Sequence, residues 1–254
     1  MKDVQNQKDP RNIPLNEVGI KNLRYPLDIK DSNGQWFTTH TTISARVGLP
    51  ADKRGTHMSR FVEIIQAYDK LNLKEMKELL RSMQTTLEAE TAYLEISFDY
   101  FVKKKAPVSG KEAYLNILVT VNASLEQDDF HFVVTVQTPV TTLCPCSKEI
   151  SDYSAHNQRA LVTITTDTQK FIPLERYVAI SEAAASSPLY TLLKRPDEKY
   201  VTEYAYDHPK FVEDVCRDVK QQLDKMEGIN SYVVEVESLE SIHNHSAYAK
   251  VTSN

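Results

Sequence analysis

The sequence predicts an α+β fold in which antiparallel sheets have helices on one face. Three observations predict it: eight segments alternate apolar and polar residues, four segments have helical periodicity, and the two kinds follow one another in a regular order. Reading along the chain gives strand, strand, helix, helix, strand, strand, and then the same six elements again. Neighbouring strands joined by short turns favour antiparallel pairing, with the helices packed on the sheet.

The strand between residues 92 and 103 has the clearest pattern. Leu94, Ile96 and Phe98 alternate with Glu95 and Ser97, which is the period of a half-buried strand. Seven further segments with two different faces are predicted as strands: about 17–31, 35–47, 112–124, 129–140, 158–167, 230–240 and 245–252.

The helices are predicted from apolar residues spaced by threes and fours. The first pair is defined by Phe61, Ile64, Ile65, Tyr68 and Leu71, and by Met76, Leu79, Leu80, Met83 and Leu87. The second pair begins with a helix from Pro173 and Leu174 through Ala185. Its stronger member contains Val212, Val215, Cys216, Val219, Leu223 and Met226, and we expect it to close near Gly228.

The repeated order divides the chain into two predicted halves, residues 1–125 and 126–254, without a close sequence repeat between them. Between the first two strands, the segment from Asp31 to Gly34 contains an Asn-Gly pair. Both residue types tolerate the positive φ of a tight hairpin turn, so this segment predicts a hairpin.

Composition excludes several classes of protein. The 254 residues have a formal net charge of -5, which gives no basis for general nucleic-acid binding. No apolar run approaches the roughly 20 residues of a membrane span, and the first residues lack a secretory segment, so we expect a cytoplasmic protein without a membrane partner.

Three cysteines indicate reduced thiols. The six glycines stand apart from one another, which excludes a phosphate-binding loop or dinucleotide fingerprint.

The segment 143–159 has the densest chemistry, because it contains Cys144, Cys146 and His156. In an extended chain the two cysteines would lie on one side, with α-carbons roughly 6.5 to 7 Å apart, at or beyond disulfide reach. The spacing matches neither a Cys-x-x-Cys redox motif nor a structural zinc site. One thiolate, one imidazole and one further ligand would form an open catalytic metal site. Two buried thiols with a surface histidine explain this segment equally well.

Other polar groups each have a structural and a chemical interpretation. His243 and His245 would share one face at a strand start, where solvent exposure is the commoner outcome. Glu213 would lie in the first turn of a helix, where the dipole alone favours a carboxylate. Glu198 falls in a charged segment that we expect to be an exposed loop.

A further cluster lies at the start of the first helix. His57, Ser59 and Arg60 could bind a phosphate there, although Ser59 could be simply a helix cap.

Taken together, five motifs in this order resemble the type IB GTP cyclohydrolase I family of the tunnelling-fold superfamily. They cover most of the chain: Glu-Val-Gly-Ile-Lys-Asn-Leu at 17–23, Arg-Gly-Thr-His-Met-Ser-Arg-Phe at 54–61, Leu-Cys-Pro-Cys-Ser at 143–147 with His-Asn-Gln-Arg at 156–159, Phe-Val-Glu-Asp at 211–214, and Glu-Ser-Ile-His-Asn-His at 240–245.

The resemblance implies a tandem tunnelling fold, with each half a strand-strand-helix-helix-strand-strand unit, assembled as a homotetramer with active sites at subunit interfaces. The family converts GTP and water to 7,8-dihydroneopterin triphosphate and formate, through attack of metal-activated water at C8 of the guanine. The product enters tetrahydrofolate synthesis and, in some organisms, the synthesis of the tRNA base queuosine.

The resemblance also implies roles for individual residues. A divalent metal, zinc or manganese, would be held by Cys144, His156 and Glu198. Glu213 would anchor the purine, because a carboxylate can accept both from a ring N–H and from an exocyclic amine. The implied proton-transfer and positioning residues are Cys146, Glu240 and His243. Those implied for the triphosphate are His57, Ser59 and Arg60.

Two rival hypotheses remain. The superfamily also contains a nitrile reductase, in which a cysteine attacks the substrate and NADPH supplies hydride. Its motif continues as Thr-Gly-Gln-Pro-Asp, whereas this chain continues as Cys-Ser-Lys-Glu-Ile and adds His156, which favours a metal site. The second rival is a non-catalytic scaffold that binds purines or pterins.

Overall fold

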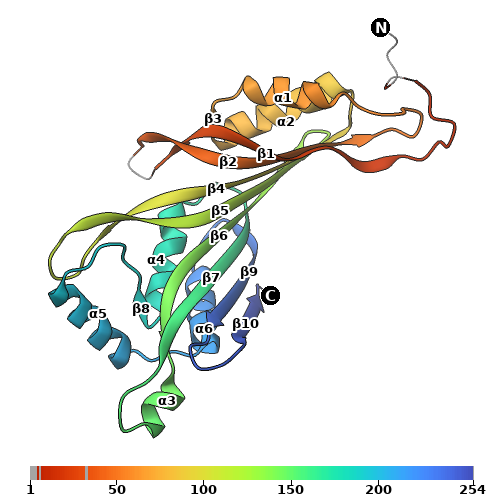
Figure 1. Cartoon of the computed structure of the whole chain (residues 1–254). Coiled ribbons are helices and arrows are strands. Elements are labelled where there is room, and N and C mark those ends of the chain that lie inside the picture. The colour runs from red at the N-terminus through yellow and green to blue at the C-terminus, as the bar shows by residue number, and fades with distance from the viewer. Residues whose placement is uncertain (1–4, 6, 32–33, 254) are drawn as a thin grey trace. The chain divides into compact units, whose positions relative to one another are not determined.

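The computed structural model describes residues 5, 7–31 and 34–253 (Figure 1). The strands are β1 (Leu15–Lys30), β2 (Trp36–Leu49), β3 (Lys70–Leu71), β4 (Thr91–Lys105), β5 (Glu112–Glu126), β6 (Asp129–Leu143), β7 (Asn157–Thr168), β8 (Ser187–Pro188), β9 (Ile229–Leu239) and β10 (Ser246–Thr252). The helices are α1 (Met58–Gln66), α2 (Leu73–Leu87), α3 (Pro145–Ile150), α4 (Leu174–Ala184), α5 (Arg195–Asp207) and α6 (Val212–Leu223).

The predicted order of elements is confirmed. All eight predicted strands and all four predicted helices are present. The pairs β1–β2, β2–β4, β7–β9 and β9–β10 are antiparallel, whereas the short β1–β3 pair is parallel. Four elements were not predicted: the two-residue strands β3 and β8, and the helices α3 and α5. These additions lie in the connections between the predicted elements.

Two compact units divide the chain, and the long strands β4, β5 and β6 contribute residues to both. One unit comprises Met1–Asp99 and Thr120–Val133, and the other comprises Tyr100–Val119 and Val134–Asn254. We refer to them as unit 1 and unit 2. The sequence-contiguous halves 1–125 and 126–254 stay a prediction.

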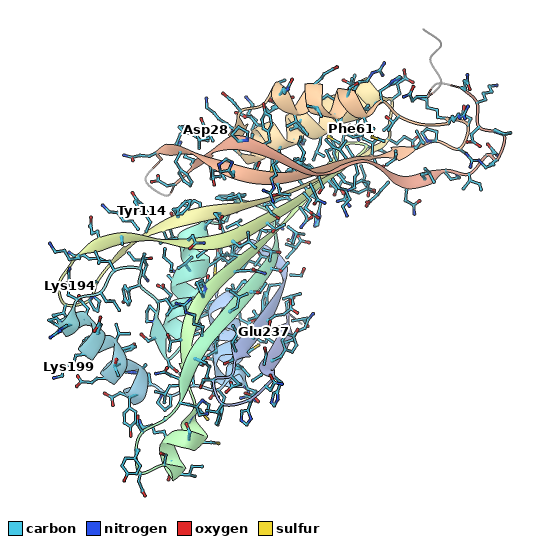
Figure 2. The ribbon with its side chains drawn as sticks, viewed as in Figure 1. Asp28, Phe61, Tyr114, Lys194, Lys199 and Glu237 are labelled. Carbon is cyan, nitrogen blue, oxygen red and sulfur yellow. The ribbon has the colours of Figure 1, made fainter. Side chains whose placement is uncertain are left out.

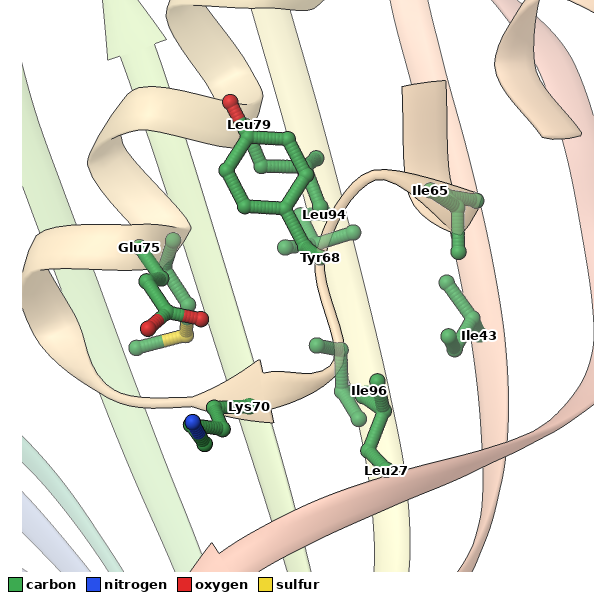
Figure 3. A pocket seen from close by; sticks show the side chains of 10 residues that line it. Leu27, Ile43, Ile65, Tyr68, Lys70, Glu75, Leu79, Leu94 and Ile96 are labelled. Carbon is green, nitrogen blue, oxygen red and sulfur yellow. The ribbon is translucent and has the colours of Figure 1, made fainter. Parts of the chain in front are cut away.

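Unit 1 packs α1 and α2 on a sheet in which β2 lies between β1 and β4. The buried residues of α2 are the five apolar positions that predicted it. Figure 3 shows side chains from both helices and from the neighbouring strands converging, among them Ile65, Leu79 and Leu94. The cavity they leave measures only about 10 Å³, at the lower limit for one water molecule. The helix–sheet layer is therefore filled by its own apolar side chains.

Gly19 explains one feature of the first motif. A Cβ placed at this position would lie 2.1 Å from the backbone oxygen of Ala45 on β2. No side chain fits at that distance, so the close approach of β1 and β2 requires glycine here.

Unit 2 has the strand order β6, β7, β9 and β10, with β8 paired to β6. Val162 of β7 lies opposite Val236 of β9, and both side chains are fully buried. Helix α6 packs against β9 and β10 and against α4. The phenol of Tyr177 on α4 is buried and lies 2.7 Å from the hydroxyl oxygen of Thr166.

Several predicted boundaries were wrong. Helix α1 ends at Gln66, so Tyr68 and Leu71 lie beyond it, and α6 ends at Leu223, before Met226. Gly228 has φ 84° and forms the turn into β9 instead of the helix cap. Apolar residues spaced by threes and fours continue past both helix ends in the sequence, and so periodicity overran both ends.

The predicted hairpin turn is only partly described, because residues 32 and 33 lie outside the described residues. The Gly34 N–H donates to the backbone oxygen of Asp31 at 3.0 Å, and Gly34 has φ 82°. Within the described part of the chain, no helix is both long and apolar enough to span a membrane.

Candidate active site

The connection between β6 and β7 brings Cys144 and His156 together. The Cys144 N–H donates to the backbone oxygen of His156 at 3.1 Å, closing the loop that contains α3. The Ser147 hydroxyl donates to the Cys144 oxygen at 3.1 Å and accepts from the His156 N–H at 3.2 Å. Two residues far apart in this connection are thus held at its base by three hydrogen bonds.

Pro145 and Cys146 lie in helix α3 and only Cys144 before them is extended, so the extended geometry considered for the whole Cys144-Pro145-Cys146 segment was wrong. Cys144 is the N-cap of α3 and Pro145 takes the first helical position, where its missing N–H costs nothing. The Ser147 N–H lies 3.5 Å from Cys144 Sγ and directs that sulfur toward the helix start. Cys146 is exposed, Cys144 is partly buried, and both are free thiols.

Beside this loop, Gln158 joins His156 to Glu240. His156 Nδ1 lies 2.8 Å from Gln158 Oε1, and Gln158 Nε2 lies 3.4 Å from Glu240 Oε1. The His156 and Glu240 side chains are only 13% and 14% exposed, and His156 Nδ1 lies 3.9 Å from Glu240 Oε2. The structure therefore brings together His156, which was predicted as a metal ligand, and Glu240, which was predicted for proton transfer and positioning.

A pocket of about 200 Å³ opens next to these groups in unit 2. Two carboxylates line it, Glu213 in the first turn of α6 and Glu240 immediately after β9, together with Cys144 and Gln158. Acceptor oxygens from two carboxylates suit a ligand rich in N–H groups, such as a purine base. This pocket collects residues from three of the five sequence motifs.

Lys210 is the cation of the same pocket. Its backbone N–H donates to the Leu143 oxygen at 3.1 Å, which ties the start of α6 to the end of β6. Its ammonium lies 2.7 Å from Asp218 Oδ2, so the charge is already paired at the pocket wall.

Glu198 lies in the first turn of α5, so the loop expected for this segment was wrong. The helix was missed because it has no apolar stripe: Asp197 and Ala205 are its buried residues. Figure 2 labels Lys194, its N-cap, and the solvent-facing Lys199. Glu198 itself is exposed, as expected.

The neighbouring Asp197 anchors α5 to the turn between β4 and β5. Its carboxylate accepts from the backbone N–H groups of Val108 at 2.8 Å, Ser109 at 2.7 Å and Lys194 at 2.8 Å. The Ser109 hydroxyl donates to it at 2.6 Å. Burial opposes ionisation, but these hydrogen bonds prevail and hold the pKa of Asp197 well below its ordinary range.

The far end of α5 contacts the β6–β7 connection. The Lys148 ammonium of α3 donates to the Tyr206 backbone oxygen at 2.5 Å and lies 4.1 Å from the centroid of the Tyr206 ring. Glu198 sits at the other end of α5, roughly 12 Å away at the helical rise of about 1.5 Å per residue. This contact therefore does not itself bring Glu198 to the β6–β7 connection.

The three predicted metal ligands therefore fit a metal only in part. A thiolate and an imidazole are donor types that suit zinc and related divalent ions. Within the described residues, however, no group of three or more His, Cys, Asp or Glu side chains is arranged to hold a metal ion. Cys144 and His156, two of the three expected ligands, lie in one connection, and Glu198 is not grouped with them.

His243 and His245 lie in the turn between β9 and β10, just before the first residue of β10. Both are exposed, and their rings stack with centroids 5.1 Å apart. Their shared orientation arises from this stacking, and not from the alternation of a strand.

His57, Ser59 and Arg60 lie in unit 1, at the start of α1. His57 is the N-cap, so the interpretation of Ser59 as a cap was wrong. An Arg60 guanidinium nitrogen donates to the Thr86 backbone oxygen at 3.2 Å. The three residues share one helix start, as the sequence predicted.

Sequence reasoning missed Gln158 and Lys210 in the pocket. Gln158 lies two residues after His156, and that spacing puts two side chains on one face of a strand. Lys210 immediately precedes the Phe-Val-Glu-Asp motif, but no pattern distinguishes it from an ordinary surface lysine.

The fold is that of the tunnelling-fold class. Uricase from Arthrobacter globiformis matches the structure with a TM-score of 0.52 at 7% identity, covering 93% of this chain and 92% of that one. A highly active mutant of the urate oxidase from Bacillus sp. TB-90 matches with a TM-score of 0.54 at 10% identity, covering 93% and 99%. At such low identity these matches establish the fold alone, and they confirm the predicted class.

The family follows from sequence. The chain belongs to the family described as type I GTP cyclohydrolase folE2, whose model matches residues 1–249. A protein named GTP cyclohydrolase FolE2 from Fervidobacterium nodosum is 51% identical over 255 residues, covering 100% of this chain and 98% of the relative. Another of that name from Thermotoga maritima is 53% identical over 251 residues, covering 99% and 96%. The predicted family is confirmed.

Proposed function

We propose that this chain is a GTP cyclohydrolase that converts GTP and water to 7,8-dihydroneopterin triphosphate and formate. The observation that supports this most is the pocket in unit 2, where Glu213 and Glu240 face one cavity with Cys144 at its wall. Family membership supports the same reaction, because relatives about half identical over the whole chain are named for it.

Glu213 is the proposed anchor of the guanine. Its position in the first turn of α6 leaves the carboxylate at the pocket with its acceptors available to a ligand. A guanine presents a ring N–H and an exocyclic amine side by side, and one carboxylate can accept from both. Such pairing would place the five-membered ring of the base away from α6.

Glu240, His243 and Cys146 are the proposed groups for proton transfer and positioning. Glu240 lines the pocket and reaches Gln158 and His156, so it could take a proton from water that attacks C8 of the guanine. His243 lies in the same Glu-Ser-Ile-His motif, three residues later. Cys146 lies one helical position after Pro145, where its exposed thiol can meet substrate or a second protein chain.

The proposed metal ligands are Cys144, His156 and Glu198, with zinc or manganese as the ion. When bound, such an ion would lower the pKa of water so that hydrolysis proceeds near neutral pH. A backbone hydrogen bond between Cys144 and His156 supports the first two, whereas Glu198 would have to reach them through a shift of α5 or from a second copy of the chain.

The remaining features of the proposal concern the triphosphate and the assembly. His57, Ser59 and Arg60 would bind the triphosphate at the N-terminus of α1, which favours anions. A homotetramer with interfacial sites is supported by exposed apolar side chains on the β6–β7 connection, where Ile150 is 83% and Tyr153 95% exposed. We also propose a cytoplasmic enzyme of folate synthesis whose product could equally supply queuosine.

One assay tests the reaction. Metal-depleted full-length protein is incubated with GTP, manganese or zinc is added back, and formate and pterin fluorescence are measured together. We expect both products only after metal addition, in equal amounts. NADPH-dependent consumption of a nitrile substrate, or tight GTP binding without formate, would replace the proposal with the reductase or the scaffold. Light scattering on the same sample measures the mass of the assembly.

A further inference from the structure

Both backbone polar groups of Leu143, the last residue of β6, are held by segments that are distant in the sequence. The Leu143 N–H donates to the Ser186 hydroxyl oxygen at 3.0 Å, and the Leu143 oxygen accepts from the Lys210 N–H at 3.1 Å. Ser186 lies between α4 and β8, and Lys210 lies just before α6. Ser186 is fully buried and Leu143 is 3% exposed, so water does not compete for these bonds.

Ser186 makes two hydrogen bonds to β6. Its N–H donates to the Thr141 oxygen at 3.0 Å, and its hydroxyl accepts from Leu143. The two residues of β8 pair with β6 at Val140 and Thr141, so this pairing stops short of Leu143. A hydroxyl oxygen can accept as a carbonyl does. The serine side chain therefore serves as the acceptor for the last N–H of the strand.

Leu143 connects two walls of the pocket in unit 2. Cys144 follows it directly in the chain, and Glu213 lies three residues after Lys210. Both Cys144 and Glu213 line the pocket. The hydrogen bond between Leu143 and Lys210 therefore joins the segment of one wall to the segment of the other, and a shift of Leu143 would alter the spacing of the two side chains.

Loss of the Ser186 hydroxyl would leave the Leu143 N–H without a partner in the interior. A buried N–H without an acceptor is unfavourable, because the hydrogen bond that it made to water in the unfolded chain is not replaced. Leu143 is almost inaccessible to water where it lies, so the end of β6 would have to move before this group could find another acceptor. Cys144 would move with it.

We propose that Ser186 is a positioning residue, whose buried hydroxyl fixes the end of β6 and so places Cys144 relative to Glu213 in the pocket. Ser186 is outside the lining of the pocket and acts through the backbone of Leu143. The effect on turnover rests on the proposed function, whereas the effect on the Cys144 thiol does not.

A matched pair of variants isolates this contact. Ser186→Ala removes the acceptor for the Leu143 N–H. Ser187→Ala removes the neighbouring hydroxyl, which is also buried but donates to the Pro188 oxygen of its own strand at 3.1 Å. Each variant loses one buried serine hydroxyl, and the two differ in whether that hydroxyl contacts β6. Circular dichroism checks that both are folded.

The first measurement follows the Cys144 thiol and needs no enzymatic reaction. Full-length protein is treated with iodoacetamide in the presence of a chelator, and mass spectrometry measures the alkylation rate of each cysteine. We expect the partly buried Cys144 to react severalfold faster in Ser186→Ala, and Cys146, whose thiol is already exposed, to keep its rate. An unchanged Cys144 rate in Ser186→Ala, or an equal rise in Ser187→Ala, would overturn the proposal.

The second measurement needs no variant. Hydrogen–deuterium exchange of the wild-type protein, resolved to single residues, should show the Leu143 amide as strongly protected as that of Val136 in the middle of β6. Exchange of Leu143 as fast as that of an exposed amide would mean that its bond to Ser186 is not formed. The proposal would then fail, whether or not Ser186→Ala folds.

Turnover separates this inference from the proposed function. Ser186→Ala should lower kcat about tenfold and keep the KM for GTP within about twofold, because the proposed anchor Glu213 remains and a displacement of about 1 Å can cost about 100-fold in rate. Ser187→Ala should keep both constants. An equal loss of kcat in the two variants would overturn the positioning role even if the wild type releases formate.

The opposite outcome is also distinguishable. Faster alkylation of Cys144 in Ser186→Ala alone, in a protein whose wild type releases no formate, would support the positioning role and remove the proposed reaction.

Discussion

The two runs of elements, β1 to β5 and β6 to β10, share one order and differ in their connections. The first run joins β1 to β2 by the short turn after Lys30 and joins α1 to α2 through residues 67–72. The second run joins β6 to β7 through α3 and joins α4 to α6 through β8 and α5. Cys144, His156 and Glu198 all lie on these longer connections. The difference teaches that the longer connections of the second run carry the three proposed metal ligands, while the repeated elements carry or adjoin other proposed site residues such as Glu213 on α6.

The strongest test of this comparison removes a reactive group from the β6–β7 connection. We expect Cys144→Ala to abolish metal retention and to reduce formate release below detection, because the imidazole of His156 alone cannot hold the ion. Metal content after dialysis, measured by mass spectrometry, checks this. Cys216→Ala removes a buried thiol on α6 and should retain metal. Equal metal content in the Cys144 variant and the wild type would contradict the ligand assignment.

The second test addresses the pocket wall on α6, an element that the sequence did predict. Glu213→Ala should weaken GTP binding about 100-fold, since two hydrogen bonds to a charged acceptor are lost. Metal content should not change. Calorimetric titration of GTP checks this, with Glu237→Ala as the control, because Glu237 is an exposed carboxylate of β9 outside the pocket. If the variant loses its metal and still binds GTP, Glu213 would be a metal ligand and not the anchor of the guanine.

The third test concerns the scaffold of unit 2. Burial raises the pKa of Tyr177 to about 12, against an ordinary value of 10.0. Because the folded-state pKa is the higher one, the stabilisation is complete below pH 10 and is lost as the pH rises toward 12, by roughly 2 kcal/mol. Urea unfolding at a series of pH values measures this.

The matched variant is Tyr177→Phe, which keeps the ring and cannot ionise. It should lose the Thr166 contact and be less stable at neutral pH, but its stability should fall less between pH 10 and 12. An identical alkaline loss in both proteins would show that other tyrosines cause it.

The fourth test asks whether unit 1 takes part in the chemistry. Arg60→Ala should raise the KM for GTP about tenfold through loss of a charge-assisted phosphate contact, and should leave guanosine binding unchanged. Arg81→Ala on α2, whose partner is Asp128, provides a control for charge. An equal effect on GTP and guanosine would exclude a phosphate role, and unit 1 would then be scaffold alone.

The smallest effect is expected at the base of α5. Asp197→Asn can still accept from Val108 and Ser109, but its amide nitrogen cannot accept from the Lys194 N–H. The first turn of α5 should therefore exchange its amide hydrogens severalfold faster, as hydrogen–deuterium exchange would detect. Asp207→Asn at the other, exposed end of the helix should leave that turn unchanged. Unaltered exchange in Asp197→Asn would contradict the anchoring role.

Most of the scaffold could be predicted because its residues obey a simple period. Leu94, Ile96 and Phe98 are buried on one face of β4, as their alternation indicated. Helix α5 could not be predicted in this way, since the residues that secure it are a buried carboxylate and one alanine. Helix α3 is only six residues long and begins at a proline, which also occurs in loops.

Some residues of the candidate site could likewise be predicted from the sequence, and others could not. The sequence grouped Cys144 with His156 in one segment and placed Glu213 in another motif, and the structure joins the first two through the backbone Cys144–His156 hydrogen bond. Gln158 could have been found from its spacing to His156, but Glu240 reaches it only through the pairing of β7 with β9. Contacts across strands depend on sheet order, which local patterns do not encode.

The closed base of the β6–β7 connection has an evolutionary consequence. The hydrogen bonds that join Cys144 to His156 lie at the base of the loop. The tip around Tyr153 can therefore gain or lose residues without displacing Cys144 or His156. Natural variation in length should therefore concentrate at that tip. The hydrogen-bonded base of this loop is a short unit that could be grafted between another pair of adjacent antiparallel strands.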